Sequence, residues 1–169
     1  MIPMRLSRNW EVEMNDLEAM SQAIIVCRVG LSLGQSPFGS AIVKNGELIS
    51  LAHNTVRCDN DPTAHAEVNA IRRASITLET FDLSGCVLYS TCEPCPMCLA
   101  ATHWSRVDRL VFGASIADAK LAGFREMPIS ATTMIQMGQS PLKVESGFLA
   151  AECRALFEEW KNSSFAQAY

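Results

Sequence analysis

The sequence has no long hydrophobic run and nothing that resembles an export signal. Its strictly apolar runs are no longer than Ala23 to Cys27, far below the roughly 20 residues that span a bilayer. Residues Met1 to Glu13 are interrupted by charge and lack the apolar centre of a secretory signal. We therefore expect a cytoplasmic protein with no membrane partner.

Clusters of lysine and arginine are also missing, and the formal net charge is −4. Proteins that bind nucleic acid usually present a basic patch, so the composition argues against such a partner and favours a small neutral substrate. Hydrophobic residues make up 49% and charged residues 19% of the 169 positions. These proportions are typical of a globular chain with a sizeable core, and we expect residues 1–169 to form one domain.

The seven cysteines are odd in number and do not resemble a disulfide framework. Three of them lie between Cys92 and Cys98, which is typical of metal binding by reduced thiols in the cytosol. We interpret the remaining four as small buried hydrophobic residues: Cys27, Cys58, Cys86 and Cys153.

Local signals predict a hairpin followed by alternating helices and strands. Asn15 is a good N-cap for a first helix that ends at Gly34, and its stripe from Leu17 to Leu31 should pack in the core. Asn45-Gly46 between two apolar runs, 38–44 and 47–53, is a strong hairpin signal. Asp61-Pro62 reads as the start of a second helix. The remaining elements are expected as strands at 86–90, 109–114 and 142–145 and as helices at 94–104, 118–122, 129–137 and 149–160. This order predicts an α/β layered fold with one antiparallel pair on a largely parallel sheet.

Two short motifs carry the chemistry. Pro94 to Cys98 forms Pro-Cys-x-x-Cys, and His65-Ala66-Glu67 forms His-x-Glu. They supply two thiolates, one imidazole and one spare carboxylate, which suits a zinc ion with three protein ligands and an open fourth position. This paired signature is typical of zinc-dependent nucleobase deaminases.

We predict one Zn²⁺ per chain, bound by His65, Cys95 and Cys98. The two cysteines lie three residues apart at a helix start, where the helix dipole favours thiolate over thiol. Glu67 follows His65 by two residues, and such residues do not share a helix face. We therefore assign Glu67 as the general acid/base that moves a proton from the attacking water to the substrate ring and then to the leaving amine.

Other interpretations of the same residues remain open. Cys92 lies three residues before Cys95 and could be a fourth ligand, but a closed site cannot activate water, so we interpret Cys92 as a packed thiol. Cys95 with Cys98 alone would also fit a redox pair or half of a structural zinc site. A zinc-stabilised binding or redox module is therefore the alternative outside enzymes.

The chain resembles the cytidine deaminase superfamily, in the branch that contains guanine deaminases, plant guanosine deaminases and tRNA adenosine deaminases. The stretches Ser90 to Cys98, His103-Trp104 and Ala122-Gly123-Phe124 are most similar to guanine deaminases. The resemblance implies a three-layer α/β/α fold with a mixed five-stranded sheet, usually as a homodimer or higher oligomer. It makes guanine the leading substrate, with another aminated ring (nucleoside, pyrimidine, pterin or triazine) or tRNA adenosine as alternatives.

The same resemblance assigns residues to the substrate pocket. Phe38 would line it, Asn54 would hydrogen-bond the base, Trp104 would close it, and Ala66 would lie against the substrate. The terminal aromatic residue, Tyr169, would close over the substrate, in its own or a partner's site. Plainer interpretations are core packing for Phe38 and Trp104, a turn side chain for Asn54, and a frayed terminus for the tail.

Guanine deaminases resemble each other in two acidic residues after the Gly-Phe pair, the second of which aids proton transfer and purine recognition. This chain instead has Arg125-Glu126. Glu126 is therefore the second candidate catalytic carboxylate.

Overall fold

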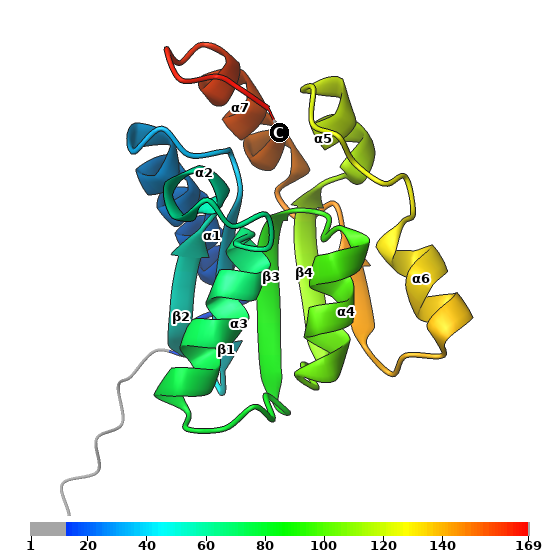
Figure 1. The fold of residues 1–169 in the computed structure, drawn as a ribbon. Coiled ribbons are helices and arrows are strands. Elements are labelled where there is room, and N and C mark those ends of the chain that lie inside the picture. The colour runs from blue at the N-terminus through cyan, green and yellow to red at the C-terminus, as the bar shows by residue number, and fades with distance from the viewer. Residues whose placement is uncertain (1–12, 169) are drawn as a thin grey trace, which may run out of the picture.

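One mixed sheet of five strands runs through the centre of residues 13–168, the part of the chain that the computed structural model describes. The strands are β1 Gly39–Lys44, β2 Glu47–His53, β3 Cys86–Cys92, β4 Arg109–Ala114 and β5 Lys143–Ser146. Their order is β2-β1-β3-β4-β5 (Figure 1). All five strands were predicted, and their boundaries differ by no more than two residues from those expected.

The sheet has two antiparallel pairings, where the sequence predicted one. β1 pairs antiparallel with β2 and also with β3, while β3, β4 and β5 are parallel. The reason is topological. The hairpin makes β2 run opposite to β1. Helix α3 (Ala66–Thr77) then returns the chain to the end of the sheet where β2 begins, and β3 runs beside β1 in the same direction as β2.

The hairpin turn has the predicted conformation. Asn45 and Gly46 both adopt positive φ, at 51° and 74°. Such a turn twists in the same sense as the strands it joins, which is why Asn-Gly favours it.

Helices cover both faces of the sheet and make the fold a three-layer α/β/α sandwich, as the resemblance implied (Figure 1). The helices are α1 Asp16–Ser32, α2 Val56–Asp59, α3 Ala66–Thr77, α4 Pro96–Trp104, α5 Ile116–Leu121, α6 Ala131–Gly138 and α7 Ala150–Lys161. Helices α1 and α7 bury Met20 and Trp160 against one face of the sheet. On the other face, α3 and α4 bury Ala70 and Leu99 against strand residues such as Leu88.

Helix α1 begins as its sequence predicts. The Asn15 side chain accepts a hydrogen bond from the backbone N–H of Glu18 at 3.0 Å, and the Glu18 carboxylate accepts one from the N–H of Asn15 at 2.9 Å. The core stripe is only partly as expected. Met20 and Ile24 are buried, but Leu17 is 55% exposed.

Helices α3, α4 and α6 begin at least two residues later than predicted, α6 at Ala131. Helix α3 starts at Ala66 with His65 as N-cap, and α4 starts at Pro96 with Cys95 as N-cap. The Asp61 carboxylate instead accepts a hydrogen bond from the N–H of Thr63 at 2.8 Å and closes a turn. The shift matters because it places His65 and Cys95 at helix starts, where the first backbone N–H groups have no partner within the helix.

Two smaller differences concern a loop and a helix end. Residues 54–60, for which no helix was predicted, contain the short helix α2. Helix α6 includes Gly138, and its C-cap is Gln139, which adopts φ 50°. Within residues 13–168, no helix combines the length and apolar character needed to cross a bilayer.

Close contact between β4 and α7 generates a stability prediction. A methyl group added at Gly113 would overlap the Cys153 side chain and approach the Phe148 carbonyl. Overpacking of this kind costs about 1–3 kcal/mol, so Gly113→Ala should lower the free energy of unfolding, measured by urea denaturation, by that amount.

Gly138→Ala is the matched control. Nothing lies within 4 Å of a methyl group at Gly138, and alanine is favoured over glycine in a helix. Equal stability of the Gly113→Ala and Gly138→Ala variants would show that α7 does not pack on β4 as closely as described.

Candidate active site and metal centre

Three side chains from two helix starts converge on one point. His65 precedes α3, Cys95 precedes α4, and Cys98 lies in the first turn of α4; their ligand atoms all lie within 4.8 Å of one another. His65 Nδ1 is 3.7 Å from Cys95 Sγ and 3.5 Å from Cys98 Sγ. A tetrahedral zinc with bonds of about 2.3 Å to sulfur and 2.0–2.1 Å to nitrogen requires an S···N separation of about 3.5 Å. The predicted ligand set therefore fits zinc.

Contact between the two thiols favours the thiolate form of Cys95 and the neutral form of Cys98. Hydrogen bonding with Cys98, and then with His65, lowers the pKa of Cys95 to about 4 despite its burial. The same contact with Cys95, together with burial, raises the pKa of Cys98. A bound divalent cation removes this competition, because it favours the thiolate form of both ligands.

Glu67 lies in the first turn of α3 and is only 6% exposed. It lines a cavity of about 20 Å³ that also reaches His65 and Cys95, and a volume of this size holds about one water. Burial raises the pKa of Glu67 to about 7, although the nearby His65 acts to lower it. A carboxylate that titrates near neutral pH can both accept and return a proton.

Glu126 and Phe38 line the same small cavity. Glu126 also borders a second, outer cavity of about 250 Å³ together with Arg125 and Met127. Burial and the Cys95 sulfur raise the pKa of Glu126, while His65 acts to lower it. In the Arg125-Glu126 pair, the glutamate therefore faces the metal ligands, while Arg125 is exposed.

Cys92 is a packed thiol. It is 4% exposed, and its Sγ lies 3.6 Å from the carbonyl oxygen of Ser115, outside the ligand group. Among the other cysteines, Cys58 is exposed, so the expectation of burial was wrong for this residue. It sits on the short surface helix α2, which buries none of its residues.

Two predicted substrate contacts are buried beside the site without lining its small cavity. Asn54 follows β2, and its side-chain oxygen accepts a hydrogen bond from the N–H of Val56 at 3.1 Å. This is the turn contact that its plainer interpretation expected. Ala66 is fully buried as the first residue of α3. Contact of either residue with substrate stays a prediction.

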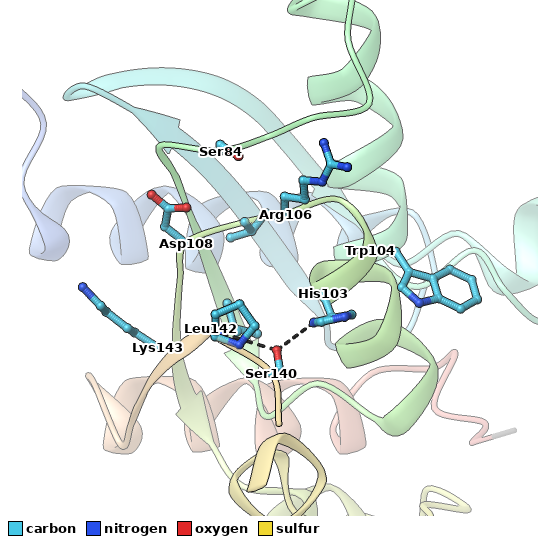
Figure 2. A pocket seen from close by; sticks show the side chains of 10 residues that line it. Ser84, His103, Trp104, Arg106, Asp108, Ser140, Leu142 and Lys143 are labelled. Atoms are coloured by element: carbon cyan, nitrogen blue, oxygen red, sulfur yellow. Dashed lines mark hydrogen bonds between the residues drawn. The ribbon is translucent and has the colours of Figure 1, made fainter. Parts of the chain in front are cut away.

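Trp104 lies at the opposite end of α4 from the cysteine ligands and is 78% exposed. It borders a separate pocket of about 680 Å³. In Figure 2 its ring points away from the 2.8 Å hydrogen bond between His103 and Ser140. Trp104 is therefore not packed in the core, and α4 carries it about 13 Å away from Cys95. Closure of a substrate pocket by Trp104 stays a prediction. Tyr169 lies outside the described residues.

Sequence reasoning missed two residues at the site. Phe124 packs edge-on against Phe38, with ring centroids 4.9 Å apart, and tilts against Trp160 at 4.8 Å. Glu93 lines the small cavity from the loop between β3 and α4. Its position between Cys92 and Pro94 indicated that Glu93 lies near the metal ligands. The sequence did not indicate what its carboxylate contacts.

A three-layer fold that brings one histidine and two cysteines within reach of one metal ion, beside a buried glutamate, defines a zinc-dependent deaminase. The chain belongs to the cytidine and deoxycytidylate deaminase family, whose zinc-binding region matches residues 13–114. It is thus an enzyme that hydrolyses a C–N bond. The family assignment and the fold expected from the resemblance are both confirmed.

Individual relatives include two kinds of deaminase. The chain is 45% identical to guanine deaminase of Bacillus subtilis (strain 168) over 112 residues, which cover 66% of this chain and 72% of that one. It is 52% identical to a tRNA-specific adenosine deaminase of Aquifex aeolicus over 81 residues, 48% of this chain and 54% of that one. The solved structure of guanine deaminase from Nitrosomonas europaea superposes with a TM-score of 0.83 at 30% identity and covers 90% of this chain and 87% of that one.

The ligand geometry generates a prediction about metal content. Protein purified without chelators should contain about one zinc per chain, and metal analysis should show that His65→Ala or Cys98→Ser loses it. Cys92→Ser should retain full zinc, because its sulfur lies outside the ligand group. Zinc-free wild type, or loss of zinc from Cys92→Ser, would contradict the three-ligand site.

Proposed function

We propose that this deaminase acts on guanine and releases ammonia, and that residues 1–169 work as one domain in the cytoplasm, where thiol ligands stay reduced. The main observation that supports deamination is that the buried Glu67 carboxylate lines the same cavity as the zinc-ligand residues His65 and Cys95. The choice of guanine is supported by the relatives in B. subtilis and N. europaea and by the second carboxylate, Glu126, at the same cavity.

The chain's own residues would carry out most of the reaction. Zinc held by His65, Cys95 and Cys98 would supply Lewis-acid activation of water. Glu67 would take one proton from the water as the water oxygen attacks the amino-bearing carbon of the ring, and would give this proton to the ring nitrogen. In a second transfer it would carry the remaining proton of the attached hydroxyl to the amino group, so that the C–N bond breaks, ammonia leaves and a carbonyl forms at the same carbon.

Recognition would fall to the groups around Glu67. The N–H donors of a guanine edge need a facing acceptor, which the Glu126 carboxylate supplies, and an unpaired buried donor costs about 1–3 kcal/mol. Phe38 would pack on the ring, Asn54 would hydrogen-bond the base, and Ala66 would lie against it. A cavity that holds about one water does not admit a purine, so the ring would occupy the outer cavity, which also borders His65, Cys95 and Glu126.

The second candidate function is deamination of tRNA adenosine, which the relative in A. aeolicus favours. The net charge of −4 and the absence of a Lys/Arg cluster weigh against it. Nucleosides, pyrimidines, pterins and triazines remain alternatives within the small-molecule class.

We further propose that the chain forms a homodimer in which Trp104 reaches the partner's site. The support is that the resemblance assigns Trp104 to a substrate pocket, while in its own chain the residue is exposed and distant from that pocket. The tail could be exchanged in the same dimer. Here the Arg57 guanidinium donates hydrogen bonds to the Phe165 carbonyl at 2.8 Å and to Gln167 at 3.3 Å, which holds the tail beside α2.

An ammonia-release assay over aminated purines, pyrimidines, pterins and triazines tests the proposed function, with guanine expected as the best substrate. Glu67→Gln should lower kcat on that substrate by about 10³-fold or more, because an amide cannot shuttle a proton. Its zinc content should equal that of the wild type.

Glu152→Gln is a suitable control, since it is the same substitution at an exposed residue that lines neither the inner nor the outer cavity. Wild-type turnover by zinc-loaded Glu67→Gln would refute its role as acid/base. Turnover of a tRNA substrate with none of guanine would favour the second candidate function.

Dimer formation can be checked by light scattering during gel filtration. We expect twice the chain mass of 18.5 kDa, and Trp104→Ala should raise KM for the best substrate, since it removes a wall of the partner's pocket. A monomer with full activity would contradict the homodimer and the placement of Trp104 in it.

A further inference from the structure

The Glu93 carboxylate joins three separate parts of the structure. Its backbone lies in the loop between β3 and α4, two residues before the ligand Cys95. One carboxylate oxygen accepts a hydrogen bond from the N–H of Ile116 at 3.0 Å, and the other accepts one from the N–H of Ala131 at 2.8 Å. Ile116 and Ala131 are the first residues of α5 and α6.

Neither helix depends on Glu93 for its own N-cap. Helix α5 has a complete capping box between Ser115 and Asp118. In α6 the Ser130 hydroxyl accepts a hydrogen bond from the N–H of Thr133. The two bonds to Glu93 are therefore additional to local capping, and what they add is a link from each helix to the metal-binding loop.

The chain between these two anchor points carries Glu126. Residues 122–130 connect α5 to α6, and within them Glu126 turns to the small cavity that Glu93 and Cys95 also line. Within this connection Phe124 is buried against Phe38 and Trp160, whereas residues 125 and 127–129 are exposed.

We propose that Glu93 is a positioning residue that holds Glu126 beside the zinc ligands by anchoring both ends of the segment 116–131 to the metal-binding loop. This inference rests on the proposed role of Glu126 in recognising the substrate. Because a side chain displaced by about 1 Å can cost a large part of the rate, loss of the anchor should affect the enzyme through Glu126, with the zinc ligands left in place.

Limited trypsin digestion of the zinc-loaded protein tests the anchor without any substrate. Arg125 is exposed within the connection, so cleavage after it reports how often the connection opens. In Glu93→Ala this cleavage should be about tenfold faster than in the wild type, and in Glu93→Gln, which keeps one acceptor oxygen, the increase should be smaller. Zinc content should not change.

Glu18→Gln is the matched control. It also removes a carboxylate that accepts a backbone N–H at a helix start, but it lies on α1. Its cleavage rate after Arg125 and its activity should equal those of the wild type. Unchanged cleavage in Glu93→Ala, equal acceleration in Glu18→Gln, or loss of zinc from Glu93→Ala would each overturn the proposal.

Kinetics on the best substrate test whether the effect passes through Glu126. Glu93→Ala should lower kcat/KM about tenfold in the wild-type background but much less in a Glu126→Gln background, since neighbours that act as a unit are not additive. Additive losses would overturn the positioning role. If Glu126→Gln itself had full activity, the proposed recognition would fail, while the trypsin result would still decide whether Glu93 anchors the segment.

Discussion

The structure depends on the meeting of two helix N-termini at one end of the sheet. Zinc needs ligands about 3.5 Å apart, and His65 and the two cysteines approach to that distance from elements 30 residues apart in sequence. Strand β3 makes this possible because it runs on to Cys92 and delivers the chain to the start of α4, directly beside the start of α3 (Figure 1).

The same arrangement makes the buried charges tolerable. A buried thiolate pair and the carboxylate of Glu67 would be costly in an apolar core. Here two helix starts direct their N–H groups to the site, and a cation completes the balance. The residues that would do the chemistry therefore lie at the ends of helices rather than along them, and Glu67 is buried beside the ligands in the first turn of α3.

Around this centre, the pocket walls come from segments on both sides of it in the chain. Phe38, Phe124, Phe157 and Trp160 form one aromatic cluster that connects the pocket to α7. Glu93 makes a second connection, to α5 and α6. The metal-binding loop thus holds the cysteine ligands and also the segment that carries Glu126. A displacement of this loop would therefore move both the metal ligands and the pocket wall that contains Glu126.

The sequence by itself determined the strands, most helices and the metal ligands, because hydrophobic period, Asn45-Gly46 and the spacing of Cys95 and Cys98 are local signals. It misplaced the starts of α3 and α4, where Asp61 and Pro94 offered competing local signals. The second antiparallel pairing, the exposure of Trp104 and the two bonds of Glu93 were decided only by the tertiary structure. Each depends on residues far apart in sequence, such as Glu93 and Ala131. A local sequence pattern does not predict which distant backbone N–H will donate a hydrogen bond to a carboxylate.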